Sequence, residues 1–399
     1  MLTAGIVAEY NPFHLGHAYQ LEQTKLAGAT HTVAVMSGNF VQRGEPAIAL
    51  KQARVKMALA NGVDLVIELP LPWATANANT FALGAVSLLN ALGVVDMLSF
   101  GSESGDVTLL KRAAEAVDSK QVNSEAIKAH LADGISFASA REAAVRELFG
   151  GTIADILKSP NDTLAVEYIR AIKILNSSMK PIAVKRFGAE HDQTGTDSLF
   201  ASASQIRKNL LAGSEYIQYL PKPSVEILAK EIEAKRAPAD YTLLETAVLC
   251  ALRKMTAEQI AIAPDISEGI ENRIFEAARS AVNLEQLFSL AKTKRYAHAR
   301  IRRIVLHSFL GVDAADSEGL PPYIRVLGLS LKGRELLRTA RKSAALPIIM
   351  KAADIFALDE RAKRIFALEC RAADIFALSL PKPLPCGLEQ KANVILNVE

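Results

Sequence analysis

The first half of the chain alternates short apolar runs with segments whose apolar residues recur every three or four positions. Helical spacing of this kind fills the intervals between the runs, for example over residues 51–61 and 80–92. Strands that alternate with helices form parallel βαβ units, so the pattern predicts an α/β fold with a Rossmann-like parallel sheet. The apolar runs, each of strand length and bounded by turn-forming residues, cover residues 2–8, 31–37, 63–69, 95–100 and 181–187.

Beyond about residue 215 the strand pattern stops and helical spacing continues alone. Apolar residues recur at helical intervals over residues 242–255, 269–280, 283–291 and 297–309. We therefore expect a Rossmann-like domain over residues 1–220 and a mainly α-helical domain without convincing strands over residues 221–399.

Polar residues follow several of the predicted strands at the point where each strand ends. They occupy residues 36–46, 68–70 and 100–106. In open parallel sheets, ligands bind beyond the carboxyl ends of the strands. The sequence therefore predicts a ligand site at this edge of the sheet, although each stretch taken alone could be an ordinary turn.

The turn after the first predicted strand carries His14 and His17 on either side of Gly16. The free N–H groups and the dipole of a helix N-terminus attract anions, and a glycine lets a phosphate approach the backbone closely. Both histidines can donate hydrogen bonds to phosphate oxygens. The chain has no GxxxxGKS sequence, which argues against a P-loop ATPase.

Other polar residues could add to an anion site. Ser202, Ser204 and Arg207 open a predicted helix, where they form either a second anion-binding nest or a plain helix cap. Asn161 also stands at a predicted helix start, and capping is its simpler role. Arg186, near the end of the run over residues 181–187, is either a solvated edge charge or an arm that reaches a ligand.

Charge is nearly balanced over the whole chain, at +3, but it is unevenly distributed. Six of the twelve residues from 292 to 303 are Lys or Arg, and Tyr296 among them could stack on a base. This density favours a nucleic-acid contact over an ordinary solvated face.

The three cysteines are far apart and form no CxxC pair, which argues against a disulfide framework or a zinc ribbon and favours a reducing cytoplasm. We expect neither a signal peptide nor a transmembrane segment.

These stretches, in this order, resemble the bacterial tRNA(Met) cytidine acetate ligases, a family of the HxGH nucleotidyltransferase-like superfamily. The resemblance rests on residues 9–17, 36–46, 64–70, 100–103, 159–161, 202–207 and 293–303, and it spans about residues 1–345. Ser202 to Arg207 are similar to the superfamily's second phosphate signature, ISSTxIR. Leu15 departs from the family, which often has asparagine inside the HxGH motif.

The resemblance implies a two-step reaction. Acetate attacks the α-phosphorus of ATP to give acetyl-adenylate, and the N4 amine of the wobble cytidine in elongator tRNA(Met) then takes the acetyl group. Mg²⁺ would accompany ATP, and no dedicated carboxylate cage or metal site is evident. Neither DNA nor a membrane is implied as a partner.

The resemblance also implies roles for individual residues. His14 and His17 would hold phosphates as the catalytic pair. The basic segment would grip tRNA through Lys294, Arg295, Arg300, Arg302 and Arg303. ATP would be bound by Val7, Ala8, Glu9, Tyr10, Asn11, Pro12, Phe13, His14, Leu15, Gly16, His17, Ala18, Tyr19, Gln20, Gly101, Asn161 and Arg186, and also by Ser202, Ser204 and Arg207.

Three alternatives remain from the residues alone. A metabolite adenylyltransferase shares the HxGH motif but is commonly about half this length and needs no basic helical domain. A class I aminoacyl-tRNA synthetase is disfavoured because KMSKS and editing insertions are missing. A non-catalytic tRNA-binding protein could keep the same fold.

Overall fold

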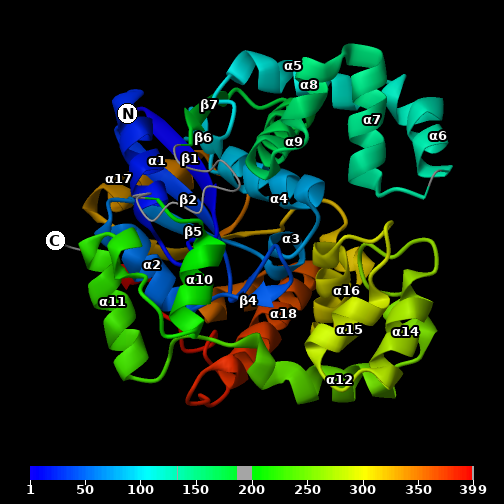
Figure 1. Ribbon diagram of the computed structural model, residues 1–399. Coiled ribbons are helices and arrows are strands. Elements are labelled where there is room, and N and C mark those ends of the chain that lie inside the picture. Colours follow the sequence, from blue (N-terminus) through cyan, green and yellow to red (C-terminus); the bar gives the residue numbers. More distant parts are fainter. Residues whose placement is uncertain (133, 187–199, 398–399) are drawn as a thin grey trace.

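The protein is described by a computed structural model over residues 1–132, 134–186 and 200–397 (Figure 1). A separate hairpin, β3 (Phe40–Val41) with β4 (Glu45–Pro46), follows the second strand. The strands of the central sheet are β1 (Thr3–Ala8), β2 (His31–Ser37), β5 (Leu65–Leu69), β6 (Met97–Ser102), β7 (Lys180–Lys185), β8 (Ile324–Leu329), β9 (Ile348–Ile349) and β10 (Ile395–Leu396).

The sheet runs in the order β10-β8-β5-β2-β1-β6-β7, and β9 pairs with β8. From β5 to β7 all neighbours are parallel, which confirms the predicted Rossmann-like α/β core. The run over residues 31–37 is a strand with those bounds, and the other four runs are strands whose ends differ by up to two residues. Phe187, the predicted end of the last run, lies outside the described residues.

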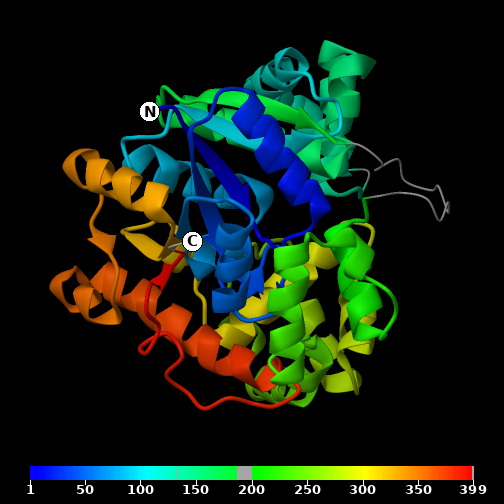
Figure 2. The same cartoon turned by 90° about the vertical axis from the view of Figure 1, so that its left-hand side faces the viewer.

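Helices of the first half connect these strands and build a lobe beside the sheet. Helices α1 and α2 lie on one face, whereas α4 and α9 lie on the other, as right-handed crossovers in opposite directions require (Figures 1 and 2). The helices are α1 (Leu15–Leu26), α2 (Lys51–Ala60), α3 (Leu71–Ala74), α4 (Ala78–Ala91), α5 (Val107–Asp118), α6 (Ile127–Ala132), α7 (Phe137–Phe149), α8 (Gly151–Ile156) and α9 (Pro160–Ile174), with a π turn at Val122–Ala126.

Helices dominate the second half, as the spacing predicts. They are α10 (Ala203–Leu211), α11 (Lys222–Glu233), α12 (Glu245–Lys254), α13 (Ala257–Ile260), α14 (Ile270–Ser280), α15 (Leu284–Ala291), α16 (His298–Leu310), α17 (Leu331–Ser343) and α18 (Glu360–Phe376). Short 3-10 turns occupy Ile217–Tyr219, Tyr241–Leu244, Ala314–Ser317, Ala352–Ala357 and Ala377–Ser379. No helix in the described ranges is long and apolar enough to cross a membrane.

The expectation of no further strand after residue 215 is wrong, because β8, β9 and β10 come from this half. All six residues of β8 are buried, so the strand shows no alternation of apolar and polar positions. Its Arg325 contacts Glu68 of β5 at 2.9 Å and Glu389 of the C-terminal segment at 2.6 Å. Lys51 of α2 also contacts Glu389, at 2.7 Å, and this buried ionic cluster fastens the late strands to the first half. The division near residue 220 stays a prediction.

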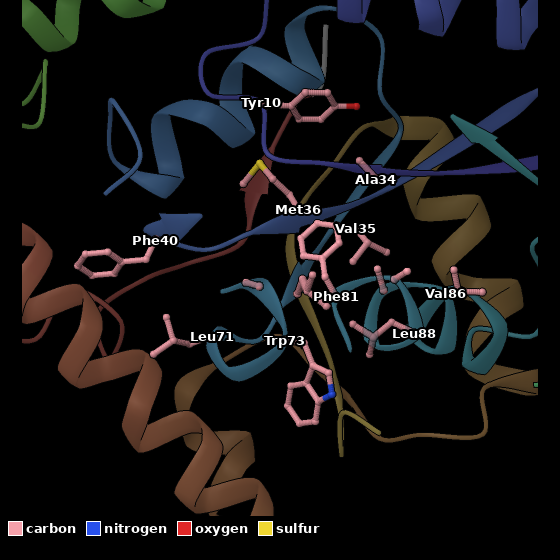
Figure 3. Packing of buried hydrophobic residues seen from close by; sticks show 14 of the residues in the cluster. Tyr10, Ala34, Val35, Met36, Phe40, Leu71, Trp73, Phe81, Val86 and Leu88 are labelled. Atoms are coloured by element: carbon pink, nitrogen blue, oxygen red, sulfur yellow. The ribbon is translucent and has the colours of Figure 1, made fainter. Parts of the chain in front are cut away.

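One part of the hydrophobic core fills the space between the sheet and the helices that follow β5 (Figure 3), and the same core continues through the helices of the second half. Val35 of β2 faces Phe81 and Val86 of α4, and Trp73 of α3 lies beneath them (Figure 3). The Trp73 side chain is 1% exposed, and its indole N–H donates to the Gly319 carbonyl at 3.3 Å. This dense packing holds the strand ends, and therefore the candidate site, in place.

Arg54 of α2 is fully buried under the strand ends. Its guanidinium donates to the carbonyls of Glu9 at 2.6 Å, Ser37 at 3.2 Å and Ala49 at 3.3 Å, and also to the carbonyl of Gly38. Burial lowers the pKa of Arg54 to about 10, so the group is still charged at neutral pH. One side chain thus joins the segments that leave β1 and β2.

We expect Arg54→Met to lower the free energy of unfolding by about 3 kcal/mol or more, because buried carbonyl oxygens lose their donor at about 1–3 kcal/mol each. Urea unfolding followed by circular dichroism measures this change. Lys56→Met on the exposed face of the same helix is the matched control, and we expect less than about 0.5 kcal/mol there. Equal effects for the two variants would contradict a role for the Arg54 hydrogen bonds.

Candidate nucleotide and RNA site

The two histidines of the HxGH motif are held by the start of α1. His14 caps the helix, because its ring Nδ1 accepts the backbone N–H of Gly16 at 3.0 Å. The backbone N–H of His14 donates in turn to the ring Nδ1 of His17 at 3.2 Å. The rings stack with centroids 3.8 Å apart. Because both Nδ1 atoms accept hydrogen bonds, each neutral ring carries its proton on Nε2. The turn therefore presents two adjacent N–H donors.

Both histidines stay uncharged at neutral pH. Burial, together with the smaller effect of the positive charges of Arg186 and Arg207, lowers the pKa of His14 to about 3. Loss of hydration likewise puts the pKa of His17 well below its usual value, with His14 and Arg186 as smaller causes. The positive potential of the site consequently comes from the two arginines, while the histidines act as neutral donors.

Two buried aromatic rings pack against the ring of His17 and support the histidine pair. Tyr10 and Phe13 are buried, and their ring centroids lie 5.0 and 5.5 Å from that of His17. Asn11 is also buried, and its Oδ1 accepts the Ile48 N–H at 2.7 Å. These three side chains shape the turn that carries the histidines.

The half-buried predicted residues line the turn and the first part of α1. Gln20 donates to the Ser99 carbonyl at 3.2 Å, which anchors α1 to β6. Glu9 accepts the Gln42 N–H at 3.0 Å, and its removal from water raises its pKa. The half-buried set consists of Val7, Ala8, Glu9, Leu15, Gly16, His17, Ala18, Tyr19 and Gln20, whereas Tyr10, Asn11, Pro12, Phe13 and His14 are buried.

Arg207 joins the second predicted anion nest to the histidine turn. Its guanidinium donates to the Asn11 carbonyl at 3.2 Å and to Glu45 at 2.8 Å. Ser202 is an exposed N-cap of α10 and accepts the Gln205 N–H at 3.2 Å. Ser204 accepts from Arg43 at 3.1 Å. The structure thus places Ser204 and Arg207 beside the turn, and Ser202 serves α10 as a cap.

Gly101, Asn161 and Arg186 gather at the ends of β6 and β7. A Cβ on Gly101 would lie 3.6 Å from the Arg186 side chain, so the two are direct neighbours. Asn161 donates to Glu103 at 2.5 Å. The predicted site residues therefore come together at the carboxyl edge of the sheet, although they come from five separate parts of the sequence.

The predicted RNA-binding residues divide into two kinds. Lys294 and Arg295 are exposed in the segment before α16, and Arg295 lies 3.9 Å from Glu268. Arg300 donates to the Asp265 carbonyl at 2.8 Å, and Arg303 to the Asp265 carboxylate at 3.1 Å, so both brace a neighbouring loop. Arg302 is half-buried and contacts Glu45 at 3.3 Å.

Sequence reasoning missed Arg54, and it named Glu45 only as part of the polar stretch over residues 36–46, without a role of its own. Charged residues on a predicted helix or turn are read as solvated, and nothing in their local sequence indicates a buried or bridging role. Asn39, inside the polar stretch after the second strand, accepts the Lys51 N–H at 3.0 Å and supports the same edge.

Because the folded protein keeps His14 neutral, its stability falls as the pH drops below about 6.5, the usual pKa of an unfolded histidine. His14→Asn preserves a capping side chain and removes this titration. We expect the variant's free energy of unfolding to fall less steeply from pH 6.5 to pH 4, by up to about 1.4 kcal/mol per pH unit. Urea unfolding at several pH values tests this, and equal slopes would contradict it.

Comparison with known proteins gives the relatives of this chain. A profile of the HIGH Nucleotidyl Transferase family matches residues 1–390. The tRNA(Met) cytidine acetate ligase of Thermoanaerobacter sp. (strain X514) is 43% identical over 357 residues, 88% of each chain. The enzyme of the same name from Acetivibrio thermocellus is 40% identical over 369 residues, 89% of each chain.

Solved structures agree with these relatives. The crystal structure of Thermotoga maritima TmcAL bound with alpha-thio ATP superposes with a TM-score of 0.92, at 33% identity and over 100% of both chains. The apo form of that protein gives 0.94 at 34% identity, again over 100% of both chains. By sequence, by fold and by the HxGH turn, the chain belongs to the tRNA(Met) cytidine acetate ligase family of HIGH nucleotidyl transferases.

Proposed function

We propose that this protein is an ATP-dependent ligase that joins acetate to the wobble cytidine of elongator tRNA(Met) to form N4-acetylcytidine. The observation that carries the proposal is the pair of neutral histidine donors at the start of α1, close enough to Arg186 and Arg207 for these charges to lower the pKa of His14. Thermotoga maritima TmcAL, whose fold this chain shares, is described with an ATP analogue bound. The half-length metabolite adenylyltransferase is not favoured, because the family match covers residues 1–390.

The first step activates acetate. A carboxylate oxygen of acetate forms a bond to the α-phosphorus of ATP, the bond from that phosphorus to the bridging oxygen breaks, and pyrophosphate leaves. Negative charge grows on the departing phosphates, where the His14 and His17 Nε2–H groups and the two arginines would stabilise it. The capped turn holds these donors in position before the substrate arrives, which is the larger part of such catalysis.

The second step transfers the acetyl group. The cytidine N4 amine attacks the acetyl carbonyl carbon, AMP leaves with the bonding pair, and the amine loses a proton. Cytosine N4 is a poor nucleophile because its lone pair is delocalised into the ring, and the adenylate supplies the good leaving group that it needs. Within the described residues we assign no general base.

Mg²⁺ would enter with ATP. Within the described ranges no group of three His, Cys, Asp or Glu side chains is placed to hold a metal ion. Glu103 and Asp162, two acidic side chains near Asn161, accept hydrogen bonds from Asn161 and from Ser104, respectively. We therefore assign no metal cage among the described residues, and Mg²⁺ would be held by phosphate oxygens of ATP.

RNA would bind on the helical half, next to the nucleotide. Lys294 and Arg295 are exposed and available to phosphates, and Arg302 reaches the rim of the nucleotide site through Glu45. Arg300 and Arg303 would act by holding this segment in shape. The proposal includes a cytoplasmic location, where tRNA and ATP are both present.

His17→Ala should reduce acetate-dependent exchange of labelled pyrophosphate into ATP by about 100-fold or more, because one preorganised donor to the phosphates is lost. His31→Ala is the matched control, since His31 begins β2 at the opposite edge of the sheet. If His17→Ala kept the full rate of acetate-dependent pyrophosphate exchange, His17 would have no role in holding the phosphates. Absence of acetate-dependent exchange in the unaltered protein, with and without tRNA, would overturn the proposed function.

The double substitution Lys294→Ala and Arg295→Ala should weaken tRNA binding and reduce the slope of log K against log salt concentration by about one to two. Filter binding at four salt concentrations measures both quantities. Lys111→Ala with Arg112→Ala, a consecutive exposed Lys-Arg pair on α5, is the matched control and should leave the slope unchanged. Equal slopes for the two double variants would indicate that Lys294 and Arg295 belong to an ordinary solvated surface and do not contact tRNA phosphates.

A further inference from the structure

We propose that the carboxylate of Glu45 makes triphosphate binding and RNA binding compete, so that pyrophosphate leaves before the RNA docks. Glu45 is a positioning residue in this account. The inference rests on the proposed function for the identity of the two ligands.

Glu45 lies in the hairpin β3–β4, between the helix of the second anion nest and the basic helix. Its Oε1 accepts from Arg207 of α10 at 2.8 Å, and its Oε2 accepts from Arg302 of α16 at 3.3 Å. The Glu45 side chain is 21% exposed, so the pair is only partly screened by water. Over the described residues, no other cation lies within 4.0 Å of this carboxylate.

The hairpin cannot move away from either helix without losing contacts. A Cβ on Gly44 would lie 2.7 Å from the backbone of both Arg302 and Arg303, and Gly44 has φ of +74°, so this residue allows the closest approach of the hairpin to α16. On the other side, Arg43 donates to Ser204 of α10 at 3.1 Å. The carboxylate is therefore fixed between its two arginines.

One carboxylate is thus shared by two guanidinium groups, each facing a different anion. Arg207 is close enough to His14 to lower its pKa, which places it toward the phosphates of ATP. Arg302 belongs to the basic segment that faces RNA. When either anion draws its arginine away, Glu45 keeps the other arginine and stays paired.

When both anions bind, Glu45 loses both partners. A partly buried carboxylate without a cation is costly. The neighbouring Glu9, whose pKa is raised mainly by burial and to a smaller extent by the charge of Glu45, adds like-charge repulsion. The second anion therefore binds more weakly than the first. Because coupling between two binding sites is reciprocal, ATP weakens RNA binding by the same factor by which RNA weakens ATP binding.

This competition orders the reaction. While the triphosphate holds Arg207, Glu45 retains Arg302 and the RNA surface is incomplete. Once the α-phosphorus has been attacked and pyrophosphate has left, Arg207 returns to Glu45 and Arg302 is released to an RNA phosphate. The cytidine then meets a site that already contains the acetyl-adenylate.

The test measures the dissociation constant of an elongator tRNA(Met) transcript by filter binding, without acetate so that no adenylate forms. We expect saturating ATP to raise this constant about fivefold or more, a typical size for coupled sites, and AMP to leave it unchanged. In Glu45→Gln the effect of ATP should fall below about twofold, because the carboxylate charge that both arginines share is gone.

Glu360→Gln, a substitution of a glutamate that is 90% exposed on α18, is the matched control and should keep the full ATP effect. The proposal would be overturned if saturating ATP left the dissociation constant of tRNA for the wild-type protein unchanged. A Glu45→Gln variant that keeps the full effect would also overturn it, because simple overlap of the two ligands would then explain the effect.

If Glu45→Gln does not fold, Arg302→Gln takes its place. Without the Arg302 guanidinium, RNA no longer competes for the Glu45 carboxylate, so the ATP effect on tRNA binding should fall below about twofold. An Arg302→Gln variant that keeps the full ATP effect would contradict the inference. Acetate-dependent pyrophosphate exchange tests the proposed function separately, so the two failures are distinguishable.

Discussion

The geometry of the candidate site depends on one buried charge, the guanidinium of Arg54. It binds carbonyl oxygens of Glu9, Ser37 and Gly38, which leave the carboxyl ends of β1 and β2. Backbone carbonyls at strand ends have no ladder partner, and the hydrogen bonds of Arg54 to Ser37 and Gly38 are buried. A single planar group with five donors can satisfy several of them at once, which explains why an arginine occupies this fully buried position.

From this anchor the rest of the site follows in sequence. The segment after Glu9 turns through Tyr10, whose φ is +45°, and reaches His14 at the start of α1. The segment after Gly38 forms the hairpin that carries Glu45. The site separates two tasks that are often combined in one side chain: neutral imidazoles can donate hydrogen bonds, and Arg186 and Arg207 supply the positive potential. Donors of fixed protonation keep this arrangement unchanged over the physiological range of pH.

The second half of the chain contributes strands to the same sheet as the first half. Strand β8 pairs antiparallel with β5, and the buried cluster of Lys51, Glu68, Arg325 and Glu389 ties it there. The unlike charges satisfy one another in a place where any one of them alone would be unstable. Helix α16 lies against the hairpin at Gly44, and Arg207 connects the hairpin residue Glu45 to the histidine turn at Asn11, so the basic segment lies near that turn.

The order of strands and helices in the first half, and the chemistry of the HxGH turn, are determined by the sequence alone. Periodicity and turn residues are local properties, and the strand over residues 31–37 was predicted with its observed bounds. Strand β8 was not predicted, because a strand that is buried on both faces shows no alternation of apolar and polar residues. Only the tertiary structure decided which protein groups the arginines bind, since the partners are distant: Arg302 lies 257 positions from Glu45, and Arg303 lies 38 from Asp265. A side chain's free energy depends on what the fold places against it, and no local pattern records that.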